Sequence, residues 1–179
     1  VGIDASESKL WGDENLKREL DPALAGGSLY EMGSYPLLPI AKLLGTDYLN
    51  INIYSRMNDN GVDVYTRGVI MHQKAVSSFQ LGLGVKTEGD LVVSGTKGYV
   101  YVPSPWWKTD YFELRYEDQN KNKKYFYTWD EPGLRYEIQE FVSCIVNSRM
   151  VSSRLTPKES IFMADVMHQF AQRKNFFEI

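Results

Sequence analysis

A glutamate and a tyrosine spaced four residues apart are the side chains of this sequence best suited to proton chemistry. Glu31 and Tyr35 stand in the segment GGSLYEMGSYPL, which begins at Gly26. On a helix this spacing places both side chains on the same face, one turn apart. A phenol can donate a proton to a developing alkoxide or carbonyl while a carboxylate orients a hydroxyl group. The same residues also fit a helix start followed by a half-buried aromatic ring, so both interpretations stay open at this point.

Other common catalytic arrangements find little support. The two histidines, His72 and His168, are far apart in the chain, and no Cys-x-x-Cys or His-Glu-x-x-His motif is present, so we expect no metal site. Cys144 falls on the apolar stripe of a predicted helix, which favours a buried small residue over a reactive thiolate. The glycines at 26–27 and 82–84 lack the spacing of a dinucleotide or P-loop motif, so we expect no cofactor-binding residues in this chain.

The composition limits the classes of partner. The 179 residues are 43% hydrophobic and 24% charged with a formal net charge of -3, which is typical of one soluble domain. Cations are not clustered, so we expect no nucleic-acid partner. The longest apolar stretches fall short of the roughly 18 to 20 residues of a spanning helix, so no membrane partner is expected. Because the chain starts at Val1 without a leader, we interpret it as a piece of a longer, cytoplasmic protein.

Hydrophobic periodicity predicts the elements that position Glu31 and Tyr35. A short strand is predicted at the start of the chain, followed by a connecting loop up to the glycine pair. Apolar residues at three- and four-residue steps predict a helix over 28–44 that ends at Gly45, with a break near Tyr35 because of two prolines. Over 48–129 the period is two and the connections are short, which predicts antiparallel strands.

Two further helices are predicted after the strands. Apolar stripes run over 134–146 and 160–170, and Thr156, Pro157 and Glu159 are typical of a capped start for the second helix. The order of helix, sheet and helices, without strand-helix alternation, predicts an α+β fold: a mostly antiparallel sheet with helices packed on one face.

Four segments of the sequence resemble, in the right order, the C-terminal domain of the Gfo/Idh/MocA family of oxidoreductases. The segment from Gly26 to Pro36 is similar to the glycine-rich signature at the start of that domain's main helix. The other three similar segments are VSGTKGYV at 93–100, LRYEIQEF at 134–141 and LTPKES at 155–160. Together they cover most of residues 18–172.

The resemblance implies that residues 1–179 are a single C-terminal domain for substrate binding and oligomerisation in a two-domain dehydrogenase. In the family a Rossmann domain comes first and binds most of the NAD or NADP; it is absent from this sequence, so the domain alone is expected to be inactive. By position, Tyr35 matches the catalytic histidine or tyrosine, as in the sugar and dihydrodiol branches. Glu31 matches an acidic substrate-binding residue that is more often aspartate. The implied parent reaction is hydride transfer between NAD(P) and a sugar-like or cyclic-polyol substrate.

Further candidates and rival interpretations remain. Arg18 lies where family members often have a basic substrate-binding residue, although a surface role fits equally. Trp106, with its neighbour Trp107, offers an aromatic wall for a sugar or, alternatively, packing or an interface. Aromatic strands around Tyr99 predict a homo-oligomer formed through the sheet face, as in the family. The rivals are a non-catalytic oligomerisation or ligand-binding module derived from the family, and a structural α+β domain whose resemblance is accidental.

Overall fold

A nine-stranded sheet organises the chain in the computed structural model, which describes residues 1–9, 16–128 and 133–179. The strand order is β8-β7-β6-β5-β1-β4-β3-β2-β9. Residues 10–15 of the predicted connecting loop lie outside the described residues. The strands are β1 Gly2–Lys9, β2 Asn50–Met57, β3 Asp63–Met71, β4 Val76–Leu83, β5 Leu91–Ser94, β6 Tyr99–Val102, β7 Tyr111–Arg115, β8 Lys123–Phe126 and β9 Phe176–Glu178.

The sheet is mostly antiparallel, as predicted from the alternation over 48–129. The exceptions are the pairs of β1 with β4 and of β2 with β9, which are parallel. Both involve a strand from outside that stretch, because β1 inserts between β5 and β4 and β9 returns from the C-terminal end to the edge of β2. The first strand is longer than the predicted one and ends at Lys9, whose side chain contacts Glu31.

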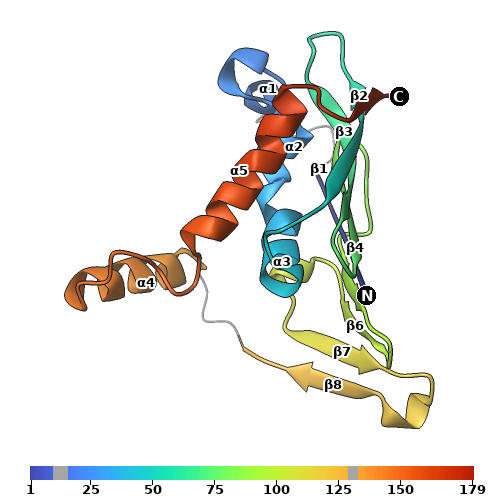
Figure 1. The fold of residues 1–179 in the computed structure, drawn as a ribbon, viewed down its shortest axis with the longest axis vertical. Coiled ribbons are helices and arrows are strands. Elements are labelled where there is room, and N and C mark those ends of the chain that lie inside the picture. The colour runs from blue at the N-terminus through green and yellow to red at the C-terminus, as the bar shows by residue number, and fades with distance from the viewer. Residues whose placement is uncertain (10–15, 129–132) are drawn as a thin grey trace.

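Three helices, α2, α3 and α5, cover one face of this sheet (Figure 1). Their bounds are Ser28–Met32, Ser34–Leu44 and Pro157–Ala171. Apolar side chains from the helices and the central strands form one core, which includes Ile3, Leu29, Met32, Leu37, Ile40, Ile51, Ile53, Phe79, Leu81, Phe162 and Val166. The helices therefore form a layer against the sheet, which confirms the α+β prediction.

Local signals set the ends of these helices. The break in the predicted 28–44 helix falls at Gly33, two residues before Tyr35, while Pro39 stays inside α3. The predicted cap of α5 is confirmed, because the Thr156 hydroxyl accepts from the Glu159 amide and the Glu159 carboxylate accepts from the Thr156 amide. Glu159 also forms a 2.8 Å ion pair with Lys42 and so ties α5 to α3.

One predicted helix differs from expectation. The helix α4, Leu134–Val146, forms as predicted, but none of its residues is buried and it projects away from the sheet (Figure 1). The expectation that it packs on the sheet face is wrong, and Cys144 is half-buried rather than buried. The predicted apolar stripe is present on this helix, but the described residues provide no surface that covers it. The remaining helix α1 is the single turn Leu16–Glu19.

Candidate functional site

Glu31 and Tyr35 lie on one continuous helical path despite the break between α2 and α3. Gly33, at the break, keeps helical angles of φ -61° and ψ -29°. Its amide donates to the Leu29 carbonyl at 2.8 Å, and the Leu37 amide donates to the Gly33 carbonyl at 3.2 Å. The four-residue spacing therefore keeps both side chains on one face, as the sequence predicts. The Tyr35 side chain is 43% exposed, so its phenol is accessible from solvent.

A buried aspartate on the sheet fixes the start of this segment. The Asp63 Oδ2 atom accepts hydrogen bonds from the Ser28 hydroxyl at 2.6 Å, the Leu29 amide at 2.9 Å and the Thr66 hydroxyl at 2.6 Å. Burial raises the pKa of Asp63, and these hydrogen bonds act in the opposite direction. Gly27 has a φ of +127°, and a Cβ at this position would overlap the Asp63 carboxylate, so only glycine fits.

Glu31 belongs to an ion cluster with three other side chains. Lys9 Nζ lies 2.7 Å from Glu19 Oε1 and 3.1 Å from Glu31 Oε1, while Arg18 Nη2 lies 2.7 Å from Glu31 Oε2. Desolvation acts to lower the pKa of Lys9, but the hydrogen bonds and charges of Glu19 and Glu31 outweigh it and raise that pKa. Both carboxylate oxygens of Glu31 are thus held by cations, and Arg18, 60% exposed, extends the cluster into solvent.

Two tryptophans border Tyr35 through the short 3-10 helix Trp106–Lys108. The Tyr35 ring meets Trp107 edge-on, with ring centroids 5.8 Å apart, and Trp107 meets Trp106 in the same way at 5.9 Å. Trp106 itself packs against the hydrophobic core, and its buried Nε1 has no hydrogen-bond partner among the described residues. Trp107 is therefore the ring beside Tyr35, and a substrate-binding role for Trp106 stays a prediction.

Sequence reasoning brought Glu31, Tyr35 and Arg18 together but missed Lys9 and Glu19. Lys9 continues the side of β1 that carries the buried residues Ile3 and Ala5, because side chains alternate along a strand. A lysine at an inward position of a strand pattern indicates a carboxylate partner, and this signal was available. The sequence around Glu19 contains no comparable signal, because what distinguishes this residue is its burial, which is known only from the structure.

The carboxyl group of Glu7, on the strand β1 that also carries Lys9, is buried and has a raised pKa. Glu7 is 6% exposed and its Oε2 has no hydrogen-bond partner within the described part of the chain. Burial raises its pKa from 4.5 to about 7, and the charge of Lys9 acts in the opposite direction. Glu7 is thus protonated at mildly acidic pH, where an ordinary glutamate is charged.

Glu7 is expected to make the protein lose stability as the pH rises. The pKa of Glu7 is higher in the folded protein than in the unfolded chain. Its contribution to the free energy of unfolding is therefore fully present below about pH 4.5 and is lost as the pH rises through about 7. Each unit of pKa shift corresponds to about 1.4 kcal/mol. Urea unfolding at pH 5 and pH 8 measures this loss. Glu7→Gln is expected to remove it and Glu117→Gln, on the exposed surface, to leave it unchanged. Equal pH dependence in all three proteins would contradict the raised pKa.

Two hollows lie away from this constellation. One, of about 360 Å³, is lined by residues 93–100 and 114–116, and the other, of about 270 Å³, lies beside Asp4, Arg67 and Asp90. Neither of these two hollows is lined by Glu31 or Tyr35. Within the described ranges, no group of three or more His, Cys, Asp or Glu side chains is arranged to hold a metal ion. No helix of these ranges is both long and apolar enough to cross a bilayer.

Comparison with curated proteins finds relatives among the dihydrodiol dehydrogenases. The trans-1,2-dihydrobenzene-1,2-diol dehydrogenase of Sus scrofa is 26% identical over 163 residues, which cover 87% of this chain and 48% of that protein. The enzyme of the same name from Oryctolagus cuniculus is 28% identical over 167 residues, covering 87% of this chain and 50% of that protein. The chain therefore spans about half the length of the curated relatives it matches. No protein-family model matches it.

Solved structures share the fold over nearly the whole chain. A 3-ketoreductase from Actinomadura kijaniata, in complex with NADP and TDP-benzene, matches with a TM-score of 0.83 and 14% identity, over 99% of this chain and 54% of that one. An aldose-aldose oxidoreductase from Caulobacter crescentus, complexed with glycerol, matches with a TM-score of 0.77 and 17% identity, over 96% of this chain and 52% of that one. Homologous sequence and shared fold together confirm the resemblance of this chain to the Gfo/Idh/MocA family of oxidoreductases.

Proposed function

We propose that this chain is the substrate-side, C-terminal domain of an NAD(P)-dependent oxidoreductase that interconverts a hydroxyl and a carbonyl group on a sugar-like or cyclic-polyol substrate. The observation that carries the proposal is the exposed Tyr35 phenol on one helix face with Glu31, in a segment that Asp63 anchors to the sheet. Homologous dihydrodiol dehydrogenases and the fold shared with sugar oxidoreductases support it.

The residues of this chain would act on the substrate by proton transfer and orientation. When a carbonyl is reduced, its oxygen gains negative charge, and the Tyr35 phenol is placed to donate the proton that neutralises it. Lys9 and Arg18 hold the Glu31 carboxylate in place, and its remaining lone pairs can accept a hydrogen bond from a neighbouring substrate hydroxyl. The Trp107 ring beside Tyr35 offers apolar contact to a sugar ring.

The start of α2 does not fit the phosphate group of a nucleotide cofactor. The start of α2, after the glycine pair 26–27, is the place most similar to a phosphate site, but the Asp63 carboxylate already accepts from the Ser28 hydroxyl and the Leu29 amide there. A carboxylate at that position repels a phosphate group. We therefore propose that a Rossmann domain elsewhere in the same protein binds NAD(P), which would supply or accept the hydride.

The test compares the full protein with residues 1–179 alone. Titrating each with NADH and NADPH, followed by cofactor fluorescence, is expected to give saturable binding for the full protein and none for residues 1–179. Oxidation of cyclic diols and aldoses is expected to follow the same division, because hydride transfer needs the bound nicotinamide. Cofactor binding or turnover by residues 1–179 alone would overturn the division of roles. Failure of the full protein to bind either cofactor would overturn the oxidoreductase proposal.

One observation favours a second function, that of a non-catalytic ligand-binding or oligomerisation module. Glu31 is longer than the more usual aspartate, and cations engage both of its oxygens, which leaves it less free to bind substrate. In that case the full protein would bind a sugar without oxidising it. A homo-oligomer through the sheet face, where Tyr99 and Phe126 are exposed, and a cytoplasmic location both stay predictions.

A further inference from the structure

The helix α4 carries an apolar stripe that the rest of the described chain leaves uncovered. The stripe residues are between 49% and 67% exposed and recur with the period of one helix face: Leu134, Ile138, Phe141, Val142 and Ile145. We call these five residues the α4 stripe. A contiguous apolar surface of this kind on a globular protein marks an interaction site, because exposing it to water is unfavourable.

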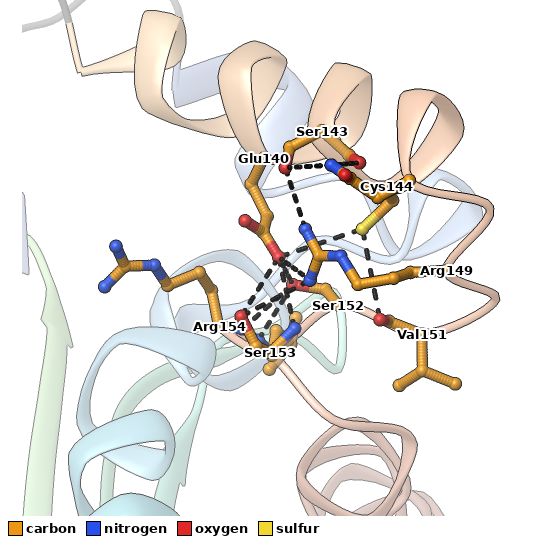
Figure 2. A network of polar contacts seen from close by, with 10 residues as sticks. Glu140, Ser143, Cys144, Arg149, Val151, Ser152, Ser153 and Arg154 are labelled. Atoms are coloured by element: carbon orange, nitrogen blue, oxygen red, sulfur yellow. Dashed lines mark hydrogen bonds and ion pairs between the residues drawn. The ribbon is translucent and has the colours of Figure 1, made fainter.

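The other side of α4 is already occupied by the loop that follows it. Glu140 Oε1 accepts from the Ser152 hydroxyl at 2.8 Å, from the Ser153 amide at 3.1 Å and from Arg149 Nη1 at 3.2 Å (Figure 2). The hydrogen bond from Ser152 and the Arg149 guanidinium hold the pKa of Glu140 near 2. At 3.6 residues per turn, Glu140 lies on the opposite side of the helix from the α4 stripe.

This arrangement makes α4 an ordered projection with one open face. The polar network fastens residues 149–153 to the back of the helix, so the loop cannot fold over the stripe while those hydrogen bonds exist (Figure 2). On the next helix along the chain, α5, Ile161 is 67% exposed as well. The stripe is thus available to a partner, and the bonds of Glu140 fix the orientation in which it is presented.

The relatives indicate what the partner is. The matched region of the Actinomadura kijaniata ketoreductase covers 99% of this chain, α4 included, yet only 54% of that protein. The curated dehydrogenases likewise have about as much chain again outside the match. The fold that includes α4 is therefore found in a protein with a second part of similar size. We propose that the α4 stripe is the surface on which the remaining half of the full protein packs, which rests on the proposed two-domain function.

The test is amide hydrogen exchange in the full protein, with two variants that place the same charge on neighbouring residues of α4. Ile138→Asp puts the charge on the α4 stripe, and Gln139→Asp puts it on an exposed position outside the stripe. Wild type and Gln139→Asp are expected to exchange the α4 amides about tenfold or more slowly than Ile138→Asp, as the loss of one buried isoleucine implies. The Val166 amide, in the core of α5, serves as the internal reference for an intact fold.

Two results would overturn the proposal. One is equal α4 exchange in wild type and Ile138→Asp; the other is protection that disappears on dilution, which assigns the α4 stripe to a second copy of the protein. If Ile138→Asp also speeds exchange at Val166, the milder pair Ile138→Ser and Gln139→Ser replaces it, with the same expectation. The readout needs no cofactor, so a protein that protects α4 but binds no nicotinamide keeps this proposal and loses the proposed function.

Discussion

Replacing Tyr35 by phenylalanine is expected to lower the kcat of the full protein by about 10²- to 10⁴-fold, the usual effect of losing a general acid. The substitution removes only the phenol oxygen, and the ring keeps its edge-on contact with Trp107. KM is expected to change much less than kcat, because the lost proton transfer belongs to the transition state rather than to substrate binding. Steady-state rates at saturating diol or aldose, with a thermal melt of each protein, measure the two effects separately.

Tyr30 provides the matched control for that substitution. It lies in the same segment and is exposed to a similar extent, 38% against 43% for Tyr35, but its ring packs edge-on against Phe170 on α5. Tyr30→Phe is therefore expected to leave kcat within about twofold of wild type, because a surface substitution away from the reacting atoms has little effect. A loss of similar size in both variants, or none in Tyr35→Phe, would show that Tyr35 does not handle the proton.

The parts of the fold that were predicted well from the sequence depend on residues that are close together in the chain. The start of α5 is an example, because Thr156 and Glu159 are three positions apart and satisfy each other's amides. The common face of Glu31 and Tyr35 is another, because one helical turn sets it. By contrast, one of the two cations that pair with Glu31 is Lys9, 22 positions earlier, and only the folded chain brings the two together. Periodicity alone cannot predict such a long-range pair.

The helix α4 shows a different limit of sequence reasoning. The spacing of Leu134, Ile138 and Phe141 predicts that this helix packs its apolar face against another surface, but it does not predict which surface that is. Sheet packing was the simplest assumption for a single domain, and the structure contradicts it. A stripe that is predicted correctly and found exposed is consistent with a chain that is one part of a larger protein.

The largest loss of stability is expected from Asp63→Ala, which is predicted to lower the free energy of unfolding by about 3 kcal/mol or more. The reason is that the substitution removes the acceptor of three hydrogen bonds in a buried place, and each buried polar group left unsatisfied costs about 1 to 3 kcal/mol. Thr66 can turn to Ser55, 2.8 Å away, but the Leu29 amide has no such alternative in its helical position. Urea unfolding measures the loss, and Asp59→Ala, at an exposed turn, is expected to stay within about 0.5 kcal/mol of wild type.

A double-mutant cycle tests whether Gly27 and Asp63 are coupled at the start of the segment that carries Glu31 and Tyr35. Gly27→Ala alone is expected to be strongly destabilising, because the new Cβ both adopts a φ of +127° and overlaps the Asp63 carboxylate. In the Asp63→Ala background the overlap is gone, so Gly27→Ala should add only the backbone strain of about 1 to 3 kcal/mol. The losses in the free energy of unfolding of the two single variants are therefore expected to sum to more than the loss of the double variant. Strict additivity would mean that glycine and aspartate act independently, and the segment that carries Glu31 and Tyr35 would then need another anchor.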